Sequence, residues 1–286
     1  MEGYICITGV SSGLGRNTAK YLNKKGFHII GTVRNASDGM AVQGEISRGF
    51  DYIITDVTSD DDVLHLAAEV NRICGDQGLK GLINNAGVVE SGPLMYMRSE
   101  KLSHQLDVNV VGVHRVTQAL FPTLRKCEDS RIINISSVSG RIGFPFVGAY
   151  ATSKFALEAY TDVLRRELIP FDIQVSVLQP SATKTPMWDK NESVLTDYAN
   201  TPYGRILEKN KKLINRPQKV GMEPEEISKK LFEMMKSKRM KTRYLLSPDR
   251  TKFKILSKLF PDRWLDRLIY KKMFLRKGKS QIDLSK

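Results

Sequence analysis

Tyr150 and Lys154 are the residues whose types and spacing most directly suggest chemistry in this sequence. They are four residues apart within a helical pattern, so their side chains project from one face. A phenol with a pKa of about 10 exchanges protons poorly at neutral pH, but a neighbouring ammonium favours the phenolate. The pair predicts general acid–base catalysis by a tyrosine, although surface helices often carry such a pair without any function.

A group of serines precedes this helix, at the end of an apolar run that predicts a strand. Ser137 lies 13 residues before Tyr150, and we expect its hydroxyl to polarise a substrate oxygen. Ser136 and Ser139 are neighbouring alternatives. A turn that uses serines only for structure would show the same pattern.

The first predicted strand runs into a glycine-rich turn that opens a helix. Glycines let the backbone turn tightly and approach a pyrophosphate, whose charge the helix N-terminus stabilises. The expected dinucleotide-binding residues of this turn are Gly9, Ser11, Ser12, Gly13, Leu14 and Gly15.

The end of the second predicted strand indicates which nicotinamide cofactor is bound. Val33 occupies the position where a carboxylate would hold the ribose hydroxyls of NAD, and Arg34 follows it. A guanidinium forms a fork with a 2′-phosphate, and Ser12 can add a hydroxyl. We therefore predict a preference for NADP(H), with NAD(H) and a merely solvated Arg34 as the alternatives.

Apolar, β-branched runs alternate with helical patterns along the chain. The predicted strands are Tyr4–Thr8, His28–Val33, Tyr52–Thr55, Gly81–Asn84, Arg131–Ser136, Ile173–Leu178 and Arg243–Leu246. The predicted helices are Gly13–Lys25, Asp60–Cys74, Ser99–Lys126, Ala149–Leu168 and Glu223–Met240. This alternation predicts a doubly wound α/β domain over residues 1–246, with a mostly parallel sheet of about seven strands.

Three motifs together resemble the short-chain dehydrogenase/reductase family. They are the G-x-x-x-G-x-G turn, Asn84-Asn85-Ala86-Gly87 and Tyr150-Ala151-Thr152-Ser153-Lys154, and the resemblance covers roughly residues 3–190. It implies a Rossmann fold and hydride transfer between a nicotinamide and a carbonyl or alcohol carbon. In this chemistry Tyr150 moves the proton, Ser137 positions the oxygen, Lys154 tunes the tyrosine and binds the nicotinamide ribose, and Asn109 anchors a water.

The resemblance also implies further cofactor contacts. Asp56 is expected to bind the adenine amino group, although it could equally serve only the turn that follows it. Asn84 is expected to contact the adenosine ribose. The remaining members of the implied set are Val57, Asn85, Ala86, Gly87, Pro180, Thr183 and Thr185. Ser181 stands where the family commonly has glycine, so the sequence departs from the family pattern next to the expected contact with the nicotinamide carboxamide. Thr185 is the candidate for this contact, with Thr183 as the alternative.

Two segments are expected to border the reactive end of the cofactor. One is Arg141–Gly148, and the other is the long connection 181–223. The second contains Met187, Trp188, Tyr198 and Tyr203. Their apolar character predicts a hydrophobic ketone, aldehyde or alcohol as substrate, unless the aromatic residues serve only to pack the loop. Together with the basic tail, the pattern Gly81–Gly87 most resembles the steroid- and retinol-dehydrogenase-like branch.

The formal net charge of +14 is concentrated at the C-terminal end. Residues 205–286 contain 25 Lys and Arg against 9 Asp and Glu, whereas residues 1–204 contain 20 against 22. We expect a helical extension over residues 247–286, divided by Pro261 into two amphipathic segments. Its apolar face carries Trp264, Leu265, Leu268 and Ile269, with basic residues beside it. Such a helix either lies on an anionic membrane or packs on its own domain or a neighbouring subunit.

Composition limits the remaining classes. The three cysteines have no ligand spacing, which favours a reducing compartment, and we expect no metal site. No long apolar run predicts a membrane span, so the expected location is cytoplasmic, with peripheral membrane contact as an alternative. We expect a homo-oligomer and no nucleic-acid partner, because no recognition motif accompanies the charge. The alternative functions are a catalytically idle nicotinamide sensor or scaffold and a protein that acts through its tail on membrane or nucleic acid.

Overall fold

The computed structural model describes residues 1–46, 48–187, 193–211, 221–249, 251, 261–276 and 279–280. Seven strands form one sheet in which every neighbouring pair is parallel, in the order β3-β2-β1-β4-β5-β6-β7. The strands are β1 Tyr4–Ile7, β2 His28–Val33, β3 Phe50–Ile54, β4 Leu79–Asn84, β5 Arg131–Ile135, β6 Gln174–Pro180 and β7 Arg243–Leu246. The predicted doubly wound fold is confirmed, with strand ends that differ from the prediction by at most two residues.

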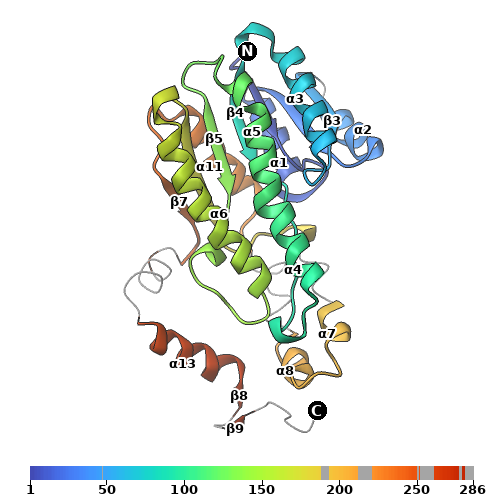
Figure 1. Cartoon of the computed structure of the whole chain (residues 1–286), viewed down its shortest axis with the longest axis vertical. Helices are drawn as coiled ribbons and strands as arrows, with labels where there is room; N and C mark the ends of the chain where they lie inside the picture. The colour runs from blue at the N-terminus through green and yellow to red at the C-terminus, as the bar shows by residue number, and fades with distance from the viewer. Residues whose placement is uncertain are drawn as a thin grey trace.

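Helices cover both faces of the sheet (Figure 1). The larger helices are α1 Gly13–Lys24, α2 Ala36–Glu45, α3 Asp60–Cys74, α4 Ser99–Leu106, α5 Gly112–Leu124, α6 Gly148–Glu167 and α11 Pro224–Lys236. Smaller helices are α7 Ser193–Asp197 and α8 Gly204–Lys209, and α13 Asp262–Met273 lies in the extension. A short hairpin of β8 Leu275–Arg276 and β9 Lys279–Ser280 follows α13.

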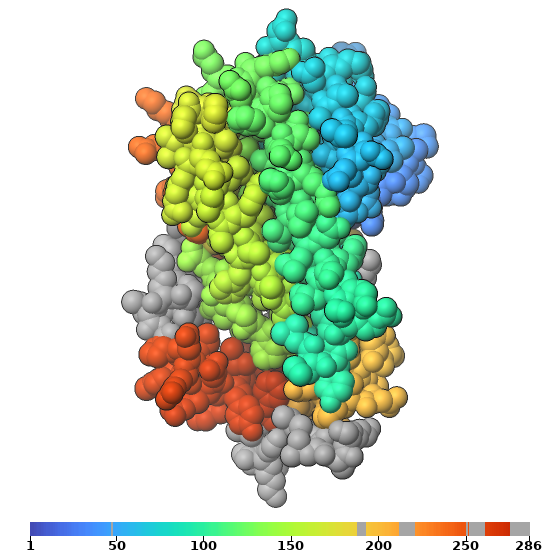
Figure 2. Space-filling view, in the orientation of Figure 1, coloured from blue at the N-terminus to red at the C-terminus, as the bar shows by residue number. Residues whose placement is uncertain are grey.

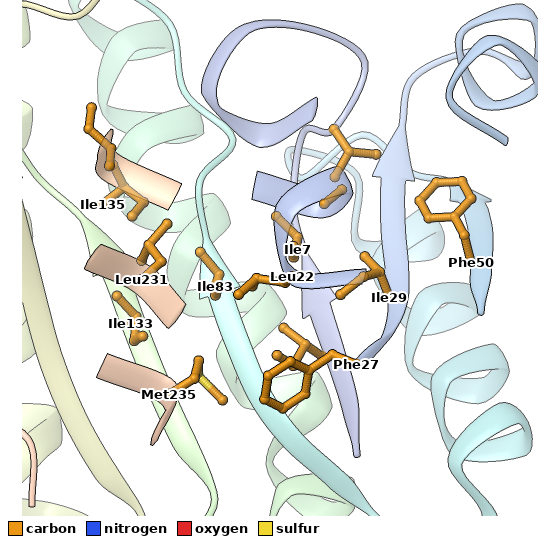
Figure 3. Packing of buried hydrophobic residues seen from close by; sticks show 14 of the residues in the cluster. Ile7, Leu22, Phe27, Ile29, Phe50, Ile83, Ile133, Ile135, Leu231 and Met235 are labelled. Atoms are coloured by element: carbon orange, nitrogen blue, oxygen red, sulfur yellow. The ribbon is translucent and has the colours of Figure 1, made fainter. Parts of the chain in front are cut away.

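The core lies on the two faces of the sheet, and strand residues alternate between them as the pleat requires. Ile5 and Ile7 pack with α1 and α11 on one face, whereas Cys6 packs with α3 and α5 on the other. Figure 3 shows the first face, where Leu22 of α1 and Leu231 of α11 meet Ile83 and Ile133 of the sheet. The carboxyl ends of all seven strands therefore meet at one edge of a rigid platform.

The helices differ from the prediction in two places. Helix α2 was not predicted, because its two glycines and weak apolar periodicity give no amphipathic pattern; Gly39 is required there because a Cβ would lie 2.3 Å from the Tyr52 ring. The predicted single helix over Ser99–Lys126 is interrupted by a π-helical turn at Asp107–Val111, which separates α4 from α5. Of the two helices predicted around Pro261, α13 is the second, and residues 252–260 lie outside the described residues.

Candidate active site

Helix α6 brings Tyr150 and Lys154 to the carboxyl edge of the sheet, both buried. The Lys154 Nζ lies 5.6 Å from the centroid of the Tyr150 ring and donates a hydrogen bond of 2.8 Å to the Ile135 carbonyl. Burial raises the pKa of Tyr150 to about 12, against a hydrogen bond to Ser137 that lowers it. Burial also lowers the pKa of Lys154 to about 8, against the charge of Glu158 that raises it. The two shifts bring a protonated phenol and a titratable amine together in one site.

Ser137 follows β5 and faces Tyr150. Its side chain makes a hydrogen bond with Tyr150, and its Oγ accepts another, of 3.1 Å, from the Ser139 backbone N–H. The Ser136 Oγ is buried without a hydrogen-bond partner among the described residues. Of the three serines considered, the structure places Ser137 against the tyrosine.

Asn109 lies inside the π-helical turn between α4 and α5 and is 1% exposed. Its Oδ1 accepts from the Val88 N–H at 2.9 Å, and its Nδ2 donates to the Val88 carbonyl and the Ser153 Oγ. These bonds fix the loop after β4 against the residue beside Lys154. The side-chain amide is thus engaged with protein, and π-helical turns of this kind occur frequently at functional sites.

The glycine-rich turn after β1 is built for a close approach. Gly9 and Gly13 adopt φ of 73° and 54°, in the left-handed region that favours glycine. A Cβ on Gly15 would lie 2.1 Å from the Gly9 carbonyl oxygen. Ser12 makes no side-chain cap at the start of α1, and the first turn has no acidic residue. This helix N-terminus therefore fits the pyrophosphate of a dinucleotide. Leu14 packs beneath it on the core, and Ser11 lies in the turn itself.

Arg34 follows β2 and is exposed next to this turn, and its charge acts on Asp56. Partial burial raises the pKa of Asp56, but hydrogen bonds from Thr58 and the charge of Arg34 outweigh it and lower the pKa. The Asp56 Oδ1 accepts from the backbone N–H and the hydroxyl of Thr58 at 2.9 and 2.7 Å. Asp56 therefore stabilises the turn that follows it through Oδ1, and its contact with the adenine amino group stays a prediction. Its neighbour Val57 is buried against Gly112.

The structure corrects the expectation for Asn84. Its side chain is 2% exposed and its Nδ2 donates to the Thr117 Oγ1 and the Asn134 Oδ1, so it is directed into the protein interior and not toward a ribose. Asn85 likewise uses its Nδ2 to hold the carbonyls of Thr8 and Gly9. The two asparagine side chains are therefore both held by contacts within the protein. A Cβ on Gly9 would lie 3.0 Å from the Ala86 Cα, and a Cβ on Gly87 would lie 3.2 Å from the Asn109 Oδ1.

The chain after β6 returns to the start of α1. Pro180 ends the strand, the Thr183 Oγ1 donates to the Ser181 carbonyl, and Thr183 pairs with Met222 in an isolated bridge. A Cβ on Gly13 would lie 3.2 Å from the Thr185 Cβ. Thr185 is therefore placed beside Gly13 of the glycine-rich turn.

The large apolar and aromatic residues of the connection 181–223 differ in their exposure. Tyr198 is 5% exposed and packs with Val194, Ile206 and Leu207 against Phe146. Tyr203 makes an edge contact with the Phe146 ring, with centroids 5.8 Å apart. The packing interpretation therefore holds for Tyr198, while Met187 is 37% exposed and Trp188 lies outside the described residues.

Two charged residues of the site were missed from the sequence. Glu158 lies one helical turn beyond Lys154 on α6 and is 7% exposed. Arg243 of β7 donates to its Oε2 at 2.8 Å. The position of Glu158 four residues after Lys154 could have indicated a contact between them. Nothing in the sequence indicated that Arg243, on an edge strand far along the chain, would pair with Glu158.

The comparisons with known proteins agree with this arrangement. A family model described as short chain dehydrogenase matches residues 3–195. The chain is 34% identical to an NADPH-dependent 3-dehydrocapnine reductase of Ornithobacterium rhinotracheale, covering 94% of this chain and 96% of that protein. It is 35% identical to retinol dehydrogenase 16 of Mus musculus, covering 63% of this chain and 56% of that protein. A short-chain dehydrogenase from Streptomyces avermitilis has a similar structure, with a TM-score of 0.76, 25% identity and coverage of 94% and 96%.

The chain belongs to the short-chain dehydrogenase/reductase family, as the motifs predicted. The similarity to retinol dehydrogenase 16 is consistent with the predicted steroid- and retinol-dehydrogenase-like branch. The protein is therefore an NAD(P)-dependent oxidoreductase that acts on CH–OH and C=O groups. Among the described residues, no helix is long and apolar enough to cross a membrane.

Proposed function

We propose that this protein is an NADP(H)-preferring reductase of a hydrophobic ketone or aldehyde, with Tyr150 as the general acid. The observation that carries the proposal is the hydrogen-bonded pair of Ser137 and Tyr150 with the Lys154 ammonium 5.6 Å from the phenol ring. These three groups lie at the strand ends where the glycine-rich turn would hold a dinucleotide. The complete arrangement disfavours a catalytically idle sensor.

The residues of the site divide the work of carbonyl reduction. The bound nicotinamide supplies the hydride. The Ser137 hydroxyl donates a hydrogen bond to the substrate oxygen and stabilises the negative charge that develops there. The Tyr150 phenol gives its proton to the same oxygen, and the Lys154 ammonium strengthens the phenol as an acid by stabilising the phenolate. Asn109 holds the π-helical turn at which a water can return a proton to Lys154.

The cofactor preference rests on the end of β2. Val33 carries no carboxylate that would repel a 2′-phosphate, and the exposed guanidinium of Arg34 follows it. The Ser12 hydroxyl makes no capping hydrogen bond and is available to the same phosphate. The relative named as NADPH-dependent supports this assignment.

The substrate class is inferred from the apolar residues around the start of α6. A hollow of about 790 Å³ lies between the start of α6 and α13 and is lined mainly by apolar side chains, among them Phe144, Phe155, Ile269 and Phe274, whereas Tyr150 and Ser137 are not among its lining residues. Phe146, at φ 69°, turns the preceding loop inward onto the cluster around Tyr198. A screen of apolar ketones, aldehydes and alcohols with NADPH and NADP⁺ tests the proposal. Oxidation of NADPH by hydrophobic ketones supports it, and turnover confined to sugars or charged acids contradicts it.

The C-terminal extension 247–286 adds a proposed contact with an anionic membrane surface. The outer face of α13, defined here as Trp264, Arg267, Leu268, Lys271 and Lys272, combines exposed apolar side chains with cations. Asp262 and Asp266 are one turn apart and project from the opposite side, where Asp266 lines the hollow against α6. Figure 2 shows α13 at the lower end of the molecule, below the start of α6. A helix of this kind binds anionic bilayers, which would also supply lipophilic substrates to a cytoplasmic enzyme.

A homo-oligomer is the second proposed association. Val111, Phe155 and Val163 expose between 41% and 49% of their surface on α6 and at the start of α5. Exposed apolar side chains on neighbouring helices are typical of subunit contacts. Light scattering after size-exclusion chromatography distinguishes a dimer or tetramer from a monomer of 32.3 kDa. A mass equal to that of the monomer would contradict this association.

A further inference from the structure

We propose that Glu158, held by Arg243, is a positioning residue that keeps Lys154 in its charged form and thereby keeps Tyr150 an effective acid. The inference rests on the proposed role of Tyr150 and extends it to a carboxylate outside the four catalytic residues. It gives a role to Glu158 and Arg243, two charged side chains that the fold brings close to Lys154.

The geometry places Glu158 directly behind Lys154. The two residues are one turn apart on the same face of α6, and both are more than 90% buried. A Cβ on Gly140 would contact both the Glu158 Cγ and the Lys154 carbonyl at 3.1 Å, so glycine allows the turn after Ser137 to lie over this part of the helix. A buried carboxylate one turn from a buried ammonium stabilises the charged amine, because little water screens the pair.

Arg243 fixes this carboxylate from the neighbouring strand. Its Nε donates to the Glu158 Oε2 at 2.8 Å, and its second guanidinium nitrogen donates to the Asp162 Oδ2 at 2.6 Å. The Glu158 Oε1 accepts no hydrogen bond among the described residues. Arg243 therefore neutralises Asp162 as well as part of the Glu158 charge, and Glu158 retains one oxygen without a donor.

The charged groups around this pair can be named. The negative charge of Glu158 raises the pKa of Lys154. Glu158 and Asp162 both act on Arg243 of β7, and Asp162 also pairs with Arg165 of α6 at 3.1 Å. Tyr150 is the titratable group that faces Lys154, and Ser137 after β5 contacts it through an uncharged hydroxyl. Burial lowers the pKa of Lys154, and the charge of Glu158 opposes this effect.

A direct titration of Lys154 tests the inference without relying on turnover. In protein labelled with ¹³C-lysine, the ε-carbon resonance that is missing from Lys154→Met identifies Lys154. It should titrate near a pH of about 8 in the wild type and about one unit lower in Glu158→Gln. Glu158→Asp, which keeps the charge, should restore most of the difference. The alkaline limb of the kcat/KM profile should move together with the resonance.

A further variant controls for a purely structural effect. Asp162→Asn removes one hydrogen-bond acceptor of Arg243 but leaves the Glu158 charge, so the Lys154 titration should stay within about 0.3 units of the wild type. An unchanged Lys154 midpoint in Glu158→Gln, or a shift in Asp162→Asn as large as that in Glu158→Gln, overturns the inference. A failure of the proposed function would appear separately, as undiminished turnover in Tyr150→Phe.

Discussion

Lysines on helices α6 and α13 experience opposite environments. Lys154 of α6 is buried, donates to a backbone carbonyl and has its pKa lowered, chiefly by burial. Lys271 and Lys272 of α13 are exposed on a helix whose acidic side chains lie on the other side. Residues 1–204 are nearly neutral, whereas residues 205–286 contain the entire basic excess. Buried charge in this protein sets reactivity, and exposed charge is available to determine where the protein binds.

The largest expected effect is the loss of turnover when the buried site loses its tyrosine. Tyr150→Phe removes the proton donor and should lower kcat by about 10³-fold, because general acid catalysis contributes on this scale. Dissociation constants for NADPH, measured by fluorescence titration, should remain within about threefold. Phe121→Leu, on another helix, serves as a control for general packing. Turnover in Tyr150→Phe close to that of the wild type would contradict the assignment.

The next effect concerns a single exposed cation that is assigned to a ligand. Arg34→Ala should lower kcat/KM for NADPH about 10- to 100-fold, since a charged hydrogen-bonded pair contributes roughly 1.5–3 kcal/mol. The value for NADH should change much less, because NADH lacks the 2′-phosphate. Steady-state kinetics with both cofactors measures the ratio, and Arg48→Ala is the control at an exposed arginine before β3, at the opposite, amino-terminal ends of the strands. Equal losses for both cofactors would show that Arg34 does not read the phosphate.

The exposed side of the comparison is tested by charge reversal on α13. Arg267→Glu combined with Lys271→Glu should weaken binding to vesicles of anionic phospholipid at least tenfold, because each basic residue contributes about 1 kcal/mol near such a surface. Co-sedimentation measures the bound fraction, and turnover of a water-soluble ketone should be unaffected. Lys229→Glu with Lys238→Glu makes the same change of net charge on another surface and should leave binding intact. Equal loss in both double variants would indicate nonspecific attraction, and binding to RNA but not to vesicles would favour the nucleic-acid alternative.

The smallest effect links the buried lysine to stability. Because burial lowers the pKa of Lys154 from 10.5 to about 8, the unfolded chain binds more protons than the folded protein between these values. The contribution of this group to stability therefore rises with pH through that window. Lys154→Met should unfold at a urea concentration a few tenths molar higher than the wild type at pH 7, with a smaller difference near pH 10. Lys229→Met, at an exposed site, should show no such pH dependence, and a constant difference in Lys154→Met would contradict the buried charge.

Local patterns predicted the parts of the molecule that short stretches of sequence determine. The seven strands, the glycine-rich turn and the pair Tyr150 and Lys154 follow from runs of about ten residues or fewer. Helix α2 was not visible, because Gly39 is explained only by the Tyr52 ring that the fold packs against it. The π-helical turn at Asn109 was also hidden, since a helix interrupted by one wide turn keeps an apolar periodicity.

The direction in which each side chain of the site points was harder to predict from the sequence. Asn84 directly follows the apolar run of β4 in a motif that predicts cofactor contact, but its Nδ2 donates to Thr117 of α5 and Asn134 of β5 in the protein interior. Glu158 reads as an ordinary helix residue until β7 brings Arg243 beside it. Both cases depend on contacts between residues more than 30 positions apart, which the sequence pattern does not contain.

The measurement that tests the central claim most directly is the fate of the hydride. NADPH carrying deuterium at the transferable position of the nicotinamide is mixed with a hydrophobic ketone, and the alcohol is analysed by mass spectrometry. The account predicts one deuterium on the carbinol carbon with the wild type and at most traces with Tyr150→Phe under the same conditions. An alcohol without deuterium, or equal labelling by both proteins at equal rates, would contradict it.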